Sequence, residues 1–116
     1  MSAISPRQAI ARLMRAMDLV GIDVTGIGRI VVTDPKTVSR WLRYETEPQR
    51  ELGELLLPLG VVLERLALVI ERGAAEDWLF TPAPMLDLDR PVDRLRRGDY
   101  QSVIWMIDAI GEGVFT

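Results

Sequence analysis

Apolar residues recur every three or four positions along most of this chain, which is the spacing of one face of an α-helix. The first such segment runs from about Ser5 to Gly21. Ser5 offers a hydroxyl to the unpaired N–H groups of the first turn, Pro6 suits that turn, and Gln8 completes a capping box. Because Gly21 is suited to ending a helix, the pattern predicts a helix between these two ends.

The longest apolar pattern lies in the middle of the chain, from Gln49 to Arg72. Its apolar positions follow the helical period over the whole segment. They are Leu52, Leu55, Leu56, Leu59, Val62, Leu63, Leu66, Val69 and Ile70. Pro58 lies inside this pattern, and a proline removes a backbone donor and clashes with the preceding turn. The sequence predicts a long helix that ends at Gly73 and is either kinked at Pro58 or divided there into two abutting helices.

Shorter helices are expected on both sides of this segment. They cover residues 25–31, 35–43, 74–80 and 91–97, and the stretch after Asp99. Thr33 or Asp34 can cap the second of these, and Asp99 can cap the last. The last helix has an apolar stripe made of Val103, Ile104, Ile107 and Ile110. Because no alternating pattern is left for a sheet, we predict an all-α fold, with residues 1–48 forming one unit and residues 49–116 another.

Residues 27–42 have the order of a helix-turn-helix unit. Its shared core would consist of Ile27, Val31, Val38 and Trp41, and Gly28 would let the two helices cross closely. The outer side of the second helix carries side chains that suit phosphates and base edges, namely Lys36, Thr37, Ser39, Arg40 and Arg43. We therefore predict that these five residues contact DNA. The alternative is a helical unit that serves only for packing.

This order resembles the Xre (Cro/repressor-like) class of DNA-binding domains. In that class the turn often carries glycine where Val32 stands here, followed by an apolar residue where Thr33 stands. The low overall charge indicates that one chain alone would bind DNA weakly. A dimer that reads a two-fold operator is therefore expected.

The charge is unevenly distributed over the 116 residues, a length that suits one domain or two small units sharing a core. Residues 1–50 contain eight Lys or Arg against five Asp or Glu, a net charge of +3. Residues 51–116 contain six against twelve, a net charge of −6, so that the whole chain carries −3. Two different partners are expected from this asymmetry, ordinary surface variation being the alternative.

The absence of both cysteine and histidine excludes several kinds of site. Disulfides, thiolate or imidazole zinc sites and Ser-His-Asp chemistry all require one of them. Asp87, Asp89 and Asp93 are close enough to suggest Mg²⁺ or Ca²⁺, but the glycine and closing glutamate of a calcium loop are missing. We expect no enzyme and no cofactor. No signal peptide or membrane span is visible, so a cytoplasmic protein with no membrane partner is expected.

The C-terminal region has a specific order of segments. Residues 77–86 read DWLFTPAPML, residues 90–100 read RPVDRLRRGDY, and residues 107–115 read IDAIGEGVF. This order resembles the toxin-binding domain of the Xre/MbcA/ParS antitoxins, and the last stretch is especially similar to the MbcA branch. Together with the Xre-like front end, the resemblance covers nearly the whole chain.

The resemblance implies an antitoxin whose partner is a RES-domain toxin that degrades NAD. The C-terminal region of such antitoxins covers the entrance to the toxin's active site, and the antitoxin or the complex represses its own operon. Val114 and Phe115 would form an apolar anchor, Gly111 and Gly113 would let the backbone leave the last helix, and Glu112 could meet a basic cleft. The candidate toxin-binding residues are Arg94, Arg97, Tyr100, Trp105, Gly111, Glu112, Gly113, Val114, Phe115 and Thr116.

Trp105 is included because it lies off the apolar stripe of the last helix. The expected assembly is a homodimer or a larger toxin–antitoxin hetero-oligomer. The alternative function is a helix-turn-helix regulator that has no toxin partner.

Overall fold

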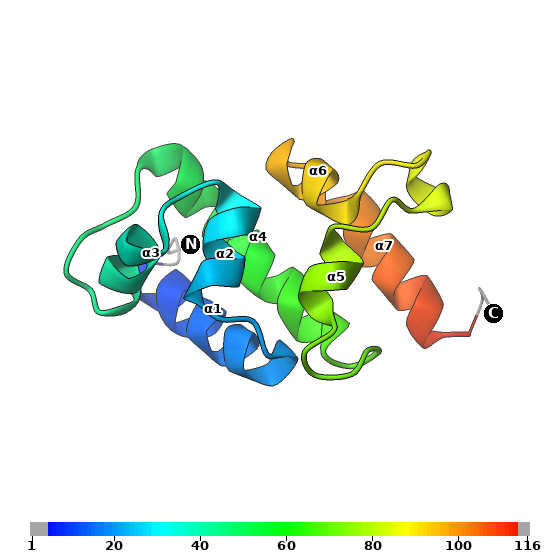
Figure 1. Ribbon diagram of the computed structural model, residues 1–116, viewed down its shortest axis with the longest axis horizontal. Coiled ribbons are helices and arrows are strands. Elements are labelled where there is room, and N and C mark those ends of the chain that lie inside the picture. The colour runs from blue at the N-terminus through cyan, green and yellow to red at the C-terminus, as the bar shows by residue number, and fades with distance from the viewer. Residues whose placement is uncertain (1–4, 114–116) are drawn as a thin grey trace.

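A computed structural model describes residues 5–113, and every regular element within this range is a helix, as the all-α prediction requires (Figure 1). The helices are α1 (Pro6–Val20), α2 (Val24–Val31), α3 (Pro35–Leu42), α4 (Arg50–Leu66), α5 (Ala75–Leu79), α6 (Pro91–Arg96) and α7 (Tyr100–Gly111). A short 3₁₀ helix, η1 (Pro84–Leu86), which the sequence did not predict, lies between α5 and α6. No helix in the described range is long and apolar enough to cross a membrane.

The predicted caps are present. The Ser5 hydroxyl accepts a hydrogen bond from the backbone N–H of Gln8, the Gln8 side chain accepts one from the N–H of Ser5, and Gly21 ends α1 with φ +76°. Asp34, rather than Thr33, caps α3. Asp99 caps α7. These predictions hold because each cap depends on residues only a few positions away along the chain.

The helix α4 differs from the prediction in its length. It continues through Pro58 as one element, so the alternative of two abutting helices is wrong. It ends at Leu66 instead of Gly73, and residues 67–70 form turns. Val69 and Ile70 still pack against the core from these turns. The apolar spacing of Val69 and Ile70 therefore reflects their burial, because both contact the core although they lie in turns after the end of α4.

The apolar stripe of α7 is also broader than predicted. Val103 and Ile107 are buried as expected, but Ile104 and Ile110 are only half-buried. Two further buried positions of this helix, Met106 and Ala109, were not predicted. Because α7 packs against both α4 and α6, it is covered over more of its circumference than a single stripe provides.

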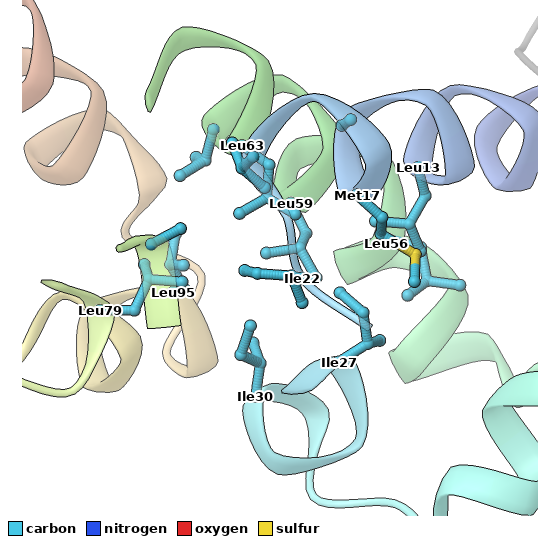
Figure 2. Packing of buried hydrophobic residues seen from close by; sticks show 14 of the residues in the cluster. Leu13, Met17, Ile22, Ile27, Ile30, Leu56, Leu59, Leu63, Leu79 and Leu95 are labelled. Carbon is cyan, nitrogen blue, oxygen red and sulfur yellow. The ribbon is translucent and has the colours of Figure 1, made fainter. Parts of the chain in front are cut away.

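One hydrophobic core joins the two predicted units. Figure 2 shows Leu13 of α1 beside Leu56 of α4, and Ile27 and Ile30 of α2 belong to the same buried cluster as Leu59 and Leu63 of α4. The same cluster includes Leu79 of α5 and Leu95 of α6 (Figure 2). α4 and α1 approach each other at Gly60, where a Cβ would lie 3.6 Å from the backbone of Leu13, an ordinary van der Waals contact. Residues of both units are thus buried in a shared interior.

The molecule is elongated, with principal extents of 44 × 33 × 23 Å. Figure 1 shows α3 at one end of the longest axis and the C-terminal end of α7 at the other. The end of α7 is thus far from α3, whereas Arg97 and Tyr100, also predicted to bind the toxin, line a pocket together with Val31 and Val32 of the predicted helix-turn-helix.

Candidate functional site

The helix-turn-helix candidate is formed by α2 and α3. Its four predicted core residues are all buried, namely Ile27, Val31, Val38 and Trp41. The carboxylate of Asp34 accepts a hydrogen bond of 2.8 Å from the N–H of Lys36 and so starts α3. A Cβ at Gly28 would lie 2.5 Å from the carbonyl oxygen of Thr33. Glycine is required there because the turn itself folds back against α2.

Val32 lies in the turn between the two helices in a left-handed conformation, with φ +57° and ψ +57°. Its side chain is 74 % exposed, so no packing compensates for this conformation. A β-branched residue is disfavoured at positive φ. The structure thus explains why a glycine would suit this position of the turn.

The predicted DNA-contacting residues lie on α3 and at its end. Lys36, Arg40 and Arg43 are exposed, while Thr37 and Ser39 are half-buried. Arg43 is engaged locally, since its Nη2 donates a hydrogen bond of 3.2 Å to the carboxylate of Glu45. Arg40 and Lys36 are four residues apart and therefore share one face of the helix.

The described part of the predicted toxin-binding set extends over α6 and α7. Trp105 is 58 % exposed, whereas Met106 and Ile107 of the same helix are buried. Glycines 111 and 113 and Glu112 are exposed at the end of α7. Val114, Phe115 and Thr116, the predicted anchor, lie outside the described residues.

Arg94 holds the segment between η1 and α7 together. Its side chain is only 17 % exposed, and Nε donates to Asp89 at 2.8 Å while Nη1 donates to Asp99 at 3.0 Å. Nη2 donates to the carbonyl oxygen of Leu86 at 3.0 Å. The predicted rim residue thus has a structural role within its own chain, whatever else it contacts.

The carboxylates of this segment titrate below their ordinary range. Hydrogen bonds from Arg97 and then Arg94 lower the pKa of Asp89. Hydrogen bonds from Ser102 and then Arg94 lower the pKa of Asp99. Arg97 donates to Asp89 at 2.8 Å but stays more exposed than Arg94. These side chains therefore remain charged far below neutral pH.

The aspartates considered as metal ligands face arginines instead. Asp93 accepts hydrogen bonds of 2.9 Å from both Nε and Nη2 of Arg90, which lowers the pKa of Asp93. Asp89 accepts from two arginines, and Asp87 lies 3.9 Å from Arg94. Within residues 5–113 no three acidic side chains are arranged to hold a metal ion.

Sequence reasoning missed an arginine cluster around Phe80. The guanidinium carbons of Arg29, Arg90 and Arg96 lie 5.1, 5.4 and 5.7 Å from the centre of the Phe80 ring. Arg96 also donates to the carbonyl oxygens of Ile30 at 3.0 Å and of Arg29 at 2.8 Å, at the end of α2. These contacts join α6 to the helix-turn-helix candidate over more than sixty residues of sequence, and no local pattern could reveal them.

The chain is similar in sequence to a known antitoxin. It is 38 % identical over 100 residues to the mycobacterial cidal antitoxin MbcA of Mycobacterium tuberculosis and of Mycobacterium bovis. The aligned part covers 86 % of this chain and 88 % of each relative. The chain belongs to the MbcA antitoxin family. This confirms the family resemblance inferred from the C-terminal segments.

A solved structure supports the same assignment to the MbcA family. The fold matches a chain of the crystal structure of the M. tuberculosis MbcT–MbcA toxin–antitoxin complex with a TM-score of 0.79. The match has 36 % sequence identity and covers 92 % of this chain and 96 % of that one. No family model matches the sequence.

Proposed function

We propose that this chain is an antitoxin that neutralises a cognate RES-domain, NAD-degrading toxin by covering the entrance to its active site. The observation that carries the proposal is the similarity to MbcA, which spans both the α1–α3 region and the α5–α7 region of this chain. The solved relative is a toxin–antitoxin complex. The chain would act by binding, and we assign it no catalytic role and no cofactor.

The toxin-facing surface would be built around the end of α7. The proposed anchor is Val114 and Phe115, because a buried phenylalanine contributes strongly to the core of an interface. Glu112 would meet a basic nucleotide-binding cleft. Trp105, which is exposed, would lie beside this anchor, and Arg94, Arg97 and Tyr100 would extend the surface toward α6 and the start of α7.

Removal of residues 113–116 tests the proposed mechanism. We expect this deletion to abolish protection of growth when the chain is co-expressed with its toxin, because the apolar anchor is lost. Purified toxin should then consume NAD in the presence of the truncated chain. A full-length variant carrying Val114→Ser and Phe115→Ser should fail equally, which separates the loss of apolar contact from the loss of length.

Unchanged protection by both variants would refute the tail mechanism. DNA binding should be the same in both, so that it serves as an internal control for folding. A chain that binds DNA but never protects against, or co-purifies with, the neighbouring gene product would instead be a regulator without a toxin.

We further propose that α3 binds operator DNA and that the chain represses its own operon, as a homodimer or within a toxin–antitoxin hetero-oligomer. Support comes from the exposed cations Lys36 and Arg40 on one face of α3. Arg40→Ala should weaken binding to the DNA upstream of its own gene by about tenfold or more. Gel-shift titration would measure this loss, and toxin inhibition should not change. If both activities fell together, the assignment of separate surfaces would be wrong.

A further inference from the structure

The cations of the chain differ in whether they are paired with a carboxylate. All fourteen Lys and Arg residues lie within residues 5–113. Ten of them form an ion pair with an Asp or Glu. The remaining four have no such pair in the described range, and they are Arg7, Arg15, Lys36 and Arg40. Arg7, Lys36 and Arg40 lie at the start of α1 or on α3, in the region of the proposed DNA surface, whereas Arg15 lies eight residues farther along α1.

Arg7 is held in place by an aromatic ring instead of a carboxylate. Its guanidinium carbon lies 4.6 Å from the centre of the Tyr44 ring. Stacking on a ring orders a guanidinium without neutralising its charge, and its N–H groups stay available at the edge. Arg7 is exposed, and the Tyr44 ring is also partly open to solvent.

Tyr44 lies directly beyond α3. Its φ is +60°, and its N–H donates to the carbonyl oxygen of Trp41 at 3.0 Å. The next N–H, of Glu45, donates to the carbonyl oxygen of Arg40 at 2.9 Å. The turn that carries the ring is thus fixed to the same helix that carries Lys36 and Arg40.

The first turn of α1 is therefore brought to the proposed DNA surface. The helices α1 and α3 are in contact, and Figure 1 shows that α1 begins beside α3. Four carboxylates lie at the ends of α3 or line a pocket with Pro6, namely Asp34, Glu45, Glu47 and Glu54. Asp34 caps α3, Glu45 pairs with Arg43 and Glu54 pairs with Arg50, so that Glu47 alone of the four has no such partner in the described range.

We propose that Arg7, oriented by Tyr44, binds a backbone phosphate of duplex DNA and extends the contact surface of α3 onto α1. The inference rests on the proposed DNA-binding function and adds a residue to it. A planar guanidinium with free N–H groups matches phosphate oxygens, and such a contact positions the protein on the duplex without reading sequence. We assign a phosphate as the ligand of Arg7 because Lys36 and Arg40, on the same proposed surface, also lack an ion pair with a carboxylate in the described range.

The test is a salt titration of DNA affinity, read by fluorescence anisotropy. Two duplexes are used, the DNA upstream of the chain's own gene and an unrelated sequence of equal length. Arg7→Gln should lower affinity about fivefold, the upper range for an exposed ion pair. The negative slope of log affinity against log salt concentration should become shallower by about 0.9, the value for one phosphate contact. Both duplexes should show the change, because a phosphate contact does not depend on sequence.

Arg15→Gln is the matched control. It removes an unpaired arginine from the same helix, eight residues and roughly 12 Å farther along its axis. Its affinity and slope should equal those of the wild type. Tyr44→Asn should lower affinity in the same direction as Arg7→Gln, because asparagine tolerates positive φ but supplies no ring. Circular dichroism spectra of all variants are compared with that of the wild type to verify folding.

The outcomes separate this inference from the proposed function. If Arg40→Gln weakens binding while Arg7→Gln behaves like Arg15→Gln, α3 binds DNA and the role of Arg7 is refuted. If the wild type binds neither duplex in a salt-dependent manner, both proposals fail together. If Arg7→Gln leaves DNA affinity unchanged but reduces toxin inhibition, Arg7 belongs to a protein interface and the inference is overturned.

Discussion

The strain at Val32 is the clearest effect of a single residue on stability. Its left-handed backbone costs an L-residue about 1 kcal/mol or more, and its exposed side chain recovers nothing by packing. Val32→Gly should therefore raise the free energy of unfolding by about 1 kcal/mol. The midpoint of thermal unfolding, followed by circular dichroism, should rise by roughly 5 °C.

A second glycine substitution separates this effect from a general effect of glycine. Arg15 is exposed and lies in the interior of α1, with helical backbone angles and no ion pair in the described range. Arg15→Gly should lower stability by about 1 kcal/mol, as glycine does inside helices. If Val32→Gly destabilised the chain by a similar amount, the argument from positive φ would be wrong.

Single residues also show what a sequence can and cannot predict. The capping roles of Ser5 and Asp99 were predictable because the partner N–H groups lie within three residues. The contacts of Arg96 with the carbonyl oxygens of Ile30 and Arg29 were not, because they connect distant parts of the chain. The low exposure of Arg94 was missed for the same reason, since an arginine in a basic run gives no sign of several polar partners within its own chain.

At the scale of elements, the junction of α6 and α7 depends on charge. Asp99 does two things there: one carboxylate oxygen accepts from the N–H of Ser102 at 3.3 Å, and the other accepts from Arg94 at 3.0 Å. Asp99→Asn keeps an N-cap, because asparagine caps helices as well as aspartate does, but removes the charge that faces Arg94. We expect this variant to be less stable than the wild type at pH 7.

The pH dependence of this difference follows from the lowered pKa of Asp99. Because the folded-state pKa is below the unfolded value of about 3.9, the carboxylate stabilises the fold fully above that value. The contribution is lost as the pH falls through the folded pKa. Urea unfolding should therefore show a gap between wild type and Asp99→Asn at pH 7 that begins to narrow below about pH 4.

Asp99→Ala controls for the cap. It removes both the charge and the capping oxygen, so it should be less stable than Asp99→Asn at pH 7 and should stay below the wild type at pH 3. A gap between wild type and Asp99→Asn that persisted unchanged at pH 3 would contradict a stabilising role of the ionised carboxylate in its contacts with Ser102 and Arg94.

The type of each element was easier to predict than its end. α4 was recognised from its apolar period, but its end was placed six residues too late because Val69 and Ile70 continue the period in turns. Gly73 donates its N–H to the carbonyl oxygen of Val20 at 2.8 Å, which returns the chain to the end of α1. Tertiary contacts of this kind decide where a helix ends, and periodicity does not record them.

For the whole molecule, the sequence predicted the fold class and two functional regions but could not show how closely these regions are joined. The boundary near residue 48 follows a real change in composition. The core nevertheless crosses it, since Leu13 and Ile30 belong to the same buried cluster as Leu79 and Leu95. Figure 1 shows α4 passing between the two regions, where it supplies interior residues to both.

A shared core predicts that the two regions unfold together. Trp41 of α3 and Trp78 of α5 report on one region each, and both pack in or against the common cluster. Two variants isolate these signals: Trp78→Phe with Trp105→Phe, and Trp41→Phe with Trp105→Phe. In each variant the urea midpoint from fluorescence should coincide with the midpoint from far-UV circular dichroism, as a two-state transition requires.

Because the fluorescence and dichroism midpoints are compared within the same variant, any effect of the phenylalanine substitutions on stability applies equally to both. If the Trp41 signal changed at a urea concentration where the dichroism still reported intact helices, residues 1–48 would form a unit that unfolds separately from the rest of the chain. Coincident transitions would mean that a destabilising change beside the proposed toxin-binding surface also reduces the fraction of chains with a folded α3. Loss of DNA binding in a variant of α7 would then be expected from unfolding alone, and assigning such a variant to either surface would require its stability to be measured first.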